Sequence, residues 1–107
     1  MQILAIREFA VAPREAITLV FQRSRPNLPV LMSIDDGPFV PVLNQFVAKM
    51  PADPTKKRKM VVMTVGEDRD TCRITIMGDS GPPDVDSLLV AGVVPIASAR
   101  YRFKVSI

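Results

Sequence analysis

Strict alternation of apolar and polar residues constrains the fold of this chain more than any other feature. Every second residue of "ARYRFKVSI", at positions 99–107, is apolar: Tyr101, Phe103, Val105 and Ile107. The residues between them are Arg100, Arg102, Lys104 and Ser106. Successive side chains of a β-strand point to opposite faces of its sheet, so this period of two predicts a half-buried strand with a basic outer face.

Further segments carry the same signal. "AITLVFQ" places Ile17, Leu19 and Phe21 on one face, and "QILAIREFAV" is rich in strand-forming residues. Two short apolar runs around the turn at 35–38 predict a hairpin whose second arm, with Pro38 and Pro41, lies at a sheet edge. Strands over 60–65 and 71–77, joined by the polar loop 66–70, predict a second hairpin. In the latter strand Cys72, Ile74 and Ile76 face the core.

Two segments favour helices or turns instead. "VLNQFVAKM" has apolar residues at helical spacing, and "PPDVDSLLVAG" begins with residues typical of a helix start and ends at Gly92. The 10 prolines are nevertheless spread along the chain, between predicted strands that recur about every 8 to 15 residues. We therefore expect an all-β fold, an antiparallel immunoglobulin-like sandwich of about seven strands. The alternative is an α+β fold with two short helices on one antiparallel sheet.

Length and composition indicate one folded domain spanning residues 1–107. The chain has 107 residues, of which 48% are hydrophobic and 23% charged, which is typical of a globular protein. No basic region precedes the first apolar residues, and no apolar run approaches the ~20 residues of a membrane span. We expect a cytoplasmic protein that binds no membrane. The single cysteine, Cys72, excludes an intrachain disulfide and is expected to be a buried strand residue.

The stretch "IMGDSGPP" contains the only short catalytic pattern. Over five residues, "GDSGP" resembles the GDSGGP around the nucleophilic serine of chymotrypsin-like proteases, and "IMGDS" resembles the opening of GDS-type esterases. A nucleophilic Ser80 needs a base to take its proton, normally histidine, and the chain contains no histidine. We therefore expect a turn here, and a protein that is not an enzyme and has no catalytic residue or cofactor.

Acidic residues cluster in two places. "DVDS" at 84–87 begins like a calcium-binding loop, and Glu67, Asp68 and Asp70 offer further oxygen ligands. The pattern then fails, because apolar Leu88 and Leu89 stand where ligands belong. The simpler interpretation is helix capping and a solvated loop, so no metal site is predicted.

Basic residues form two rows. The first row, in a predicted loop, is Lys56, Lys57, Arg58 and Lys59. The second, on one face of the last strand, is Arg100, Arg102 and Lys104. If the two rows are neighbours, a polyanion such as nucleic acid can lie across them, although charged outer faces also simply keep sheets soluble. The net charge of +3 favours anionic partners only weakly.

By elimination, we expect a non-catalytic interaction or assembly module that acts through protein–protein contacts or self-association. Unpaired sheet edges suit this role because another chain can add a strand to them. Two candidate edges follow from the sequence, the proline-rich arm and the last strand. Their candidate partner-binding residues are Phe39, Val40, Val42, Val105 and Ile107. The alternative is a small basic protein that binds a polyanion or nucleic acid through the two basic rows.

Overall fold

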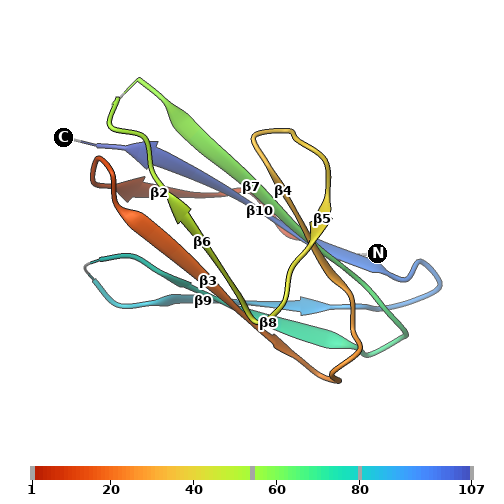
Figure 1. The fold of residues 1–107 in the computed structure, drawn as a ribbon. Helices are drawn as coiled ribbons and strands as arrows, with labels where there is room; N and C mark the ends of the chain where they lie inside the picture. The colour runs from red at the N-terminus through yellow and green to blue at the C-terminus, as the bar shows by residue number, and fades with distance from the viewer. Residues whose placement is uncertain (1, 54, 80, 107) are drawn as a thin grey trace.

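All the regular structure in the described part of the chain is β-strand. The computed structural model describes residues 2–53, 55–79 and 81–106. The strands are β1 (Gln2–Ile3), β2 (Arg7–Val11), β3 (Ala16–Arg23), β4 (Val30–Ile34), β5 (Val40–Pro41), β6 (Gln45–Lys49), β7 (Lys57–Val65), β8 (Thr71–Met77), β9 (Asp84–Leu89) and β10 (Ile96–Val105). They form two sheets that pack face to face (Figure 1).

Each sheet has its own strand order. The six-stranded sheet has the order β1-β10-β7-β4-β5, and β2 pairs with β10 beside β1. The four-stranded sheet has the order β6-β3-β8-β9. β1 and β2 run parallel to β10, and every other described pair is antiparallel. The prediction of an antiparallel all-β sandwich is thus confirmed.

Alternating residues of both sheets meet in one shared hydrophobic core, as the sequence pattern predicts. Tyr101, Phe103 and Val105 of β10 are buried, as are the predicted inward-facing residues of β3 and β8. The largest fully buried side chains come from strands of both sheets and, for Leu28, from the loop between β3 and β4: Tyr101, Phe103, Leu19, Leu28, Met32, Met60, Ile74 and Leu88. The alternation therefore predicts correctly which face of each of these strands is buried.

The described residues form more strands than the predicted seven because one predicted strand is divided in two and because β6 and β9 form in segments that favoured helices or turns. "QILAIREFAV" is divided into β1 and β2, and β5 is only two residues long. The hairpin predicted at 35–38 is confirmed, since β4 and β5 are antiparallel neighbours. Its turn holds Asp35 and Asp36 at φ values of 51° and 61°, which aspartate tolerates better than most residues.

The helical interpretation of two segments is wrong, and with it the α+β alternative. "VLNQFVAKM" contains β6, and "DVDSLLVAG" contains β9. Within each strand burial alternates, so Ala48 and Leu88 are buried while Val47 and Val85 are 54% and 44% exposed. Pairing with β3 and β8 in the sheet outweighs the weak local helical signal.

The predicted hairpin between β7 and β8 is also wrong. The loop between them does fold as a turn, because the Glu67 N–H donates to Asp70 Oδ2 at 2.7 Å and the Asp70 N–H to the Glu67 carbonyl at 3.0 Å. The two strands nevertheless lie in different sheets, β7 between β10 and β4 and β8 between β3 and β9. A crossing loop lets both strands turn their apolar faces toward the same core.

A buried carboxylate organises the glycine-rich loop after β8. Glu15 is 8% exposed, and its Oε1 accepts a hydrogen bond from the Ala12 N–H at 2.8 Å. Its Oε2 accepts one from the Asp79 N–H at 2.9 Å. The "GDSGP" stretch is therefore anchored at its start as a loop, while Ser80 itself lies outside the described residues.

We predict that Gly78→Ala destabilises the protein by about 1–3 kcal/mol, because the added methyl group would overlap Glu15 Oε2 and force the buried carboxylate to move. The measurement is urea unfolding of wild type and variant. Asp79→Ala is the matched control, since it changes an exposed neighbour and keeps the backbone N–H that Glu15 binds. Equal stability of the two variants would contradict this role of Gly78.

Candidate functional site

In a β-sandwich, the sheet edges are surfaces where another chain can bind by strand pairing. Each sheet has two edges. In the six-stranded sheet, β5 forms one edge and β1 and β2 together form the other; in the four-stranded sheet, the edges are β6 and β9. An outer strand presents backbone N–H and C=O groups that another chain can pair with. What lies against each of these edges decides which of them is available.

Arg7 joins the edge strands β2 and β9 on one side of the sandwich. Its Nη1 donates to Asp86 Oδ1 at 2.7 Å, and its Nη2 to Asp84 Oδ1 at 3.0 Å. The buried Tyr101 hydroxyl donates to the other Asp86 oxygen at 2.7 Å. These contacts hold the two sheets together at an edge, and they direct the "DVDS" carboxylates toward a guanidinium.

Burial is the largest cause that raises the pKa of Tyr101, and the hydrogen bond to Asp86 raises it further. The hydroxyl therefore stays protonated and remains a donor to Asp86. The β9 edge has a further contact, because the Leu89 N–H donates to the side-chain oxygen of Gln2 at 2.7 Å. Side chains of β1 and β2, Gln2 and Arg7, thus tie these N-terminal strands to β9 on this side of the sandwich.

β5 lies at an edge, as predicted, but it is poorly suited to strand pairing. It has two residues, and one of them is Pro41, which has no N–H to donate. Phe39 and Val40 are each 45% exposed. Val42, a predicted edge residue, is instead buried, and its N–H donates to the Val30 carbonyl at 3.0 Å.

The prediction that the last strand is a free edge is wrong. β10 lies between β7 and the two N-terminal strands, and Val105 pairs with Val11 of β2 in parallel register. The Ser106 N–H also donates to the Val11 carbonyl at 2.8 Å. Parallel pairing between the two ends of a chain leaves no local sequence signal, which explains the error. Ile107 lies outside the described residues.

Of the edges that the structure describes, β6 is the one that neither a proline nor a side-chain contact to another edge strand restricts. The Phe21 N–H donates to the Asn44 carbonyl at 2.9 Å, and the Met50 N–H to the Glu15 carbonyl at 2.8 Å. Backbone direction alternates along a strand, so residues 44, 46, 48 and 50 turn their polar groups toward β3. The N–H and C=O groups of Gln45, Val47 and Lys49 then point away from the sheet. Among the described strands, only β3 pairs with β6.

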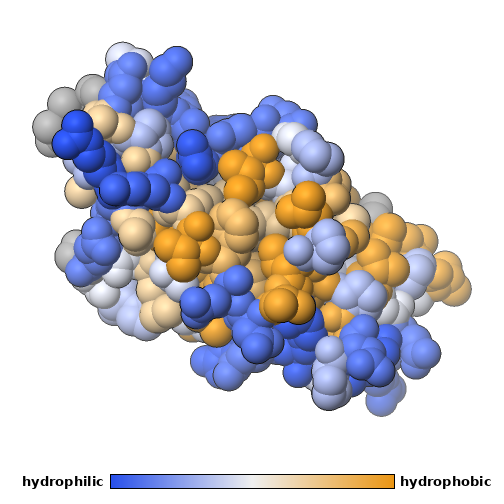
Figure 2. All heavy atoms as spheres, viewed as in Figure 1, coloured by the Kyte–Doolittle hydropathy of each residue, from blue (hydrophilic) through white to orange (hydrophobic). Residues whose placement is uncertain are grey.

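The outer face of the four-stranded sheet carries almost no charge. Its residues, which alternate with the buried ones, are Gln45, Val47, Lys49, Ala16, Thr18, Val20, Gln22, Thr71, Arg73, Thr75, Met77, Val85, Ser87 and Leu89. Lys49 and Arg73 are the charged members of this set. Next to β6, Leu43 is 81% exposed. In the view of Figure 2, apolar atoms gather across the middle of the molecule, near β5 and β6, and also lie at its right-hand end, while hydrophilic atoms cover the upper left and the bottom.

The sequence analysis missed β6 because apolar residues at 42, 43, 46, 47 and 50 match a helical period. The signal that would have found it is the alternation of Gln45, Val47 and Lys49 with Phe46 and Ala48.

Arg23 fixes the segment that leads into β6. Its Nε donates to the Leu28 carbonyl at 2.8 Å, and its Nη1 and Nη2 donate to the carbonyls of Leu43 and Val42, each at 2.6 Å. These two residues belong to the connection by which the chain passes from β5 in one sheet to β6 in the other. The Arg23 guanidinium thus fixes the position of the chain immediately before β6.

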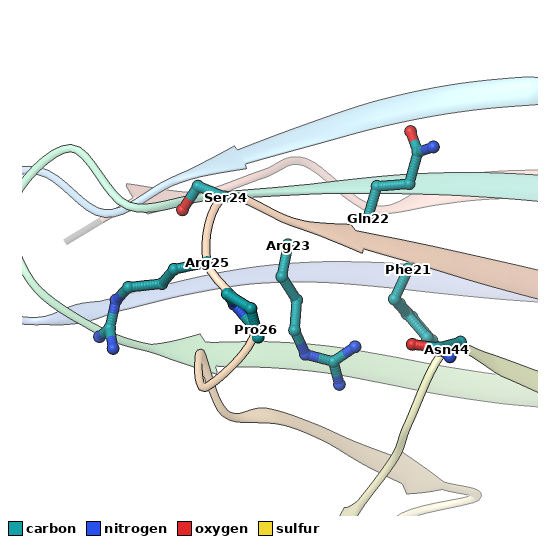
Figure 3. A pocket seen from close by; sticks show the side chains of 7 residues that line it. All are labelled: Phe21, Gln22, Arg23, Ser24, Arg25, Pro26 and Asn44. Atoms are coloured by element: carbon teal, nitrogen blue, oxygen red, sulfur yellow. The ribbon is translucent and has the colours of Figure 1, made fainter.

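An open groove of about 460 Å³ lies beside this connection. It is lined by Phe21, Gln22, Arg23, Ser24, Arg25, Pro26 and Asn44, and Figure 3 shows Arg23 and Arg25 extending to different sides of it. Arg25 forms an ion pair with Asp70 at 3.0 Å, and its hydrogen bond lowers the pKa of that carboxyl group. Both guanidinium groups in the groove therefore already have protein acceptors.

The two basic rows do become neighbours, because β7 and β10 are adjacent and antiparallel. Lys57 lies opposite Lys104, and Lys59 lies opposite Arg102. Lys57 and the two residues after it belong to strand β7, so the prediction that the first row lies in a loop is wrong for them. The like charges of Lys57 and Lys104 face each other directly, which is unfavourable. The nearby Glu8 carboxylate, whose pKa is lowered first by a hydrogen bond from Arg102 and further by both lysines, offsets part of this repulsion.

Carboxylates neutralise much of this basic surface. Lys59 pairs with Asp36 at 2.8 Å, Arg102 with Glu8 at 2.7 Å, and Arg58 with Asp35 at 3.5 Å. The hydrogen bond from Arg102 lowers the pKa of Glu8, so this partner stays ionised. Arg100 reaches the Leu4 carbonyl at 3.5 Å. Within the described residues, Lys56, Lys57 and Lys104 have no ion-pair partner.

Cys72 is completely buried, as predicted, and burial raises its pKa to about 11, so it is not a reactive thiol. In the part of the chain that the structure describes, no three His, Cys, Asp or Glu side chains are grouped so that they could hold a metal ion. That part also contains no helix able to cross a membrane.

In comparisons with known proteins, no family model, no curated protein and no solved structure matches this chain.

We predict that Arg23→Met destabilises the protein by about 1.5–3 kcal/mol, because the Val42 and Leu43 carbonyls lose a charged donor. Denaturant unfolding measures the change. Arg73→Met is the control on the neighbouring strand, where the side chain is exposed, and it should stay within about 0.5 kcal/mol of wild type. A similar loss in both variants would show that Arg23 has no special role.

Proposed function

We propose that this protein is a non-catalytic interaction module that binds another protein chain by strand addition at β6. One observation carries the proposal: among the described residues, no strand lies beside the outward backbone groups of Gln45, Val47 and Lys49. By contrast, Pro41 interrupts β5, and side chains tie β9 to β1 and β2. Strand addition uses such groups for affinity and the neighbouring side chains for specificity.

The surroundings of β6 support this function. Each backbone hydrogen bond that an added strand forms contributes about 0.5–1.5 kcal/mol. Exposed Val47 and Leu43 add apolar area, and the charge-poor outer face beside them needs little desolvation when a partner covers it. The Arg23 contacts hold the entry to the strand in place, so less conformational entropy is lost on binding.

A photo-cross-linking amino acid at position 47 tests the proposal in the cells that make the protein. We expect irradiation to attach a protein at position 47 and not at position 85. Val85 is the matched control, because it is also an exposed valine on an outer strand of the same sheet. The proposal is wrong if neither position, or both equally, yields a cross-linked product.

Binding of a polyanion is a second proposal, favoured by the opposed lysines Lys57 and Lys104. An anion placed between them would relieve their repulsion, and Lys56 precedes them in the chain. The neutralised neighbours Lys59 and Arg102 leave this surface small, so we rank the proposal below strand addition.

We predict that the double variant Lys57→Glu/Lys104→Glu loses retention on a heparin column, because the cations without ion-pair partners are removed. The double variant Lys59→Glu/Arg102→Glu reverses as many charges but removes cations that already have partners, so it should lose much less. Equal losses would show that only net charge matters and would remove the support for a polyanion site.

A further inference from the structure

We propose that the partner of β6 is β6 of a second copy of this chain, paired antiparallel with Val47 opposite Val47. This inference rests on the proposed function and names the partner for the same edge. The resulting dimer would join the two four-stranded sheets into one continuous sheet across a two-fold axis. A two-fold interface uses the same surface on both copies, so the strand must be complementary to itself.

β6 is self-complementary in this register. With Val47 on the two-fold axis, Gln45 of each copy lies opposite Lys49 of the other, so no like charges meet. The three outward-facing residues then form directly opposed pairs, and each pair exchanges two backbone hydrogen bonds. On the inner face, half-buried Phe46 lies opposite the small, buried Ala48. A large residue therefore meets a small one at each inner position.

Other registers are worse for identifiable reasons. Centring the pair on Lys49 places two ammonium groups directly opposite each other. Centring it on Gln45 places Lys49 opposite Pro41, which belongs to β5 and has no N–H. Centring it on Phe46 pairs Lys49 with Leu43, whose carbonyl already accepts a hydrogen bond from Arg23. Centring it on Ala48 pairs Gln45 with Pro51, which has no N–H. The sequence and the direction of the backbone groups together leave the register centred on Val47.

The interface is small, because two five-residue strands form its centre. Stable complexes usually bury at least about 1,200 Å² in total, so dimerisation should depend on protein concentration. The outer faces of the two sheets would extend one another, and both carry few charges.

Disulfide formation between single-cysteine additions tests the register directly. In the proposed dimer, Gln45 and Lys49 of opposite copies have Cα atoms about 5.5 Å apart, within the range of a disulfide. The two Gln45 residues, or the two Lys49 residues, lie roughly 14 Å apart. A mixture of Gln45→Cys and Lys49→Cys proteins should therefore form a disulfide-linked heterodimer under mild oxidation.

Each variant alone is the control and should form disulfide dimers at least about tenfold more slowly than the mixture. The native Cys72 does not interfere, because it is completely buried. Wild-type protein, oxidised in parallel, accounts for any reaction of that thiol. Both substituted positions are exposed, so both variants should fold.

Equal rates for the mixture and the separate variants, or no disulfide dimer at all, would overturn the self-pairing proposal. The proposed function is judged separately by the photo-cross-linking at position 47. A cross-link there to a different protein, with no disulfide heterodimer here, would keep strand addition at β6 and reject the second copy as its partner.

Discussion

The contact of Asp86 with Tyr101 and Arg7 is the polar interaction on which the sandwich depends. Asp86 lies on the inward-facing side of β9, where an unpaired carboxylate would oppose the packing of the two sheets. The Tyr101 hydroxyl and the Arg7 guanidinium satisfy both of its oxygens. Because Arg7 belongs to the opposite sheet, the same contact that makes this carboxylate tolerable also closes one side of the sandwich.

The proposed function uses the opposite side of the sandwich. There the chain crosses from β5 to β6, and Arg23 fixes the crossing through backbone carbonyls. Pro41 makes β5 unsuitable for pairing, whereas β6 ends its sheet without a proline and with a single charge, on Lys49. Natural proteins usually protect such edges with charge, proline or a covering segment. An edge that lacks most of these features is a reasonable place for a partner strand.

The alternation in the sequence was sufficient to predict the fold class and the buried face of several strands, for example the faces that carry Phe103 on β10 and Ile74 on β8. The alternation could not predict which strands are neighbours in a sheet, because strand pairing depends on residues far apart in the chain. β2 pairs in parallel with β10, and the loop after Val65 carries the chain into the other sheet. The basic rows became neighbours as hypothesised, but their neutralisation by Glu8 and Asp36 depends on β2 and on the β4–β5 turn.

Amide hydrogen exchange, measured by NMR on dilute and concentrated protein, tests the central claim that β6 is a free edge that accepts another strand. The account predicts fast exchange at Gln45, Val47 and Lys49 in dilute protein and slower exchange at high concentration. The amides of Phe46 and Ala48, which bond to β3, should be protected at both concentrations. Slow exchange at Val47 in dilute protein would show that the edge is already occupied. Fast exchange at both concentrations would show that a second copy does not pair with it.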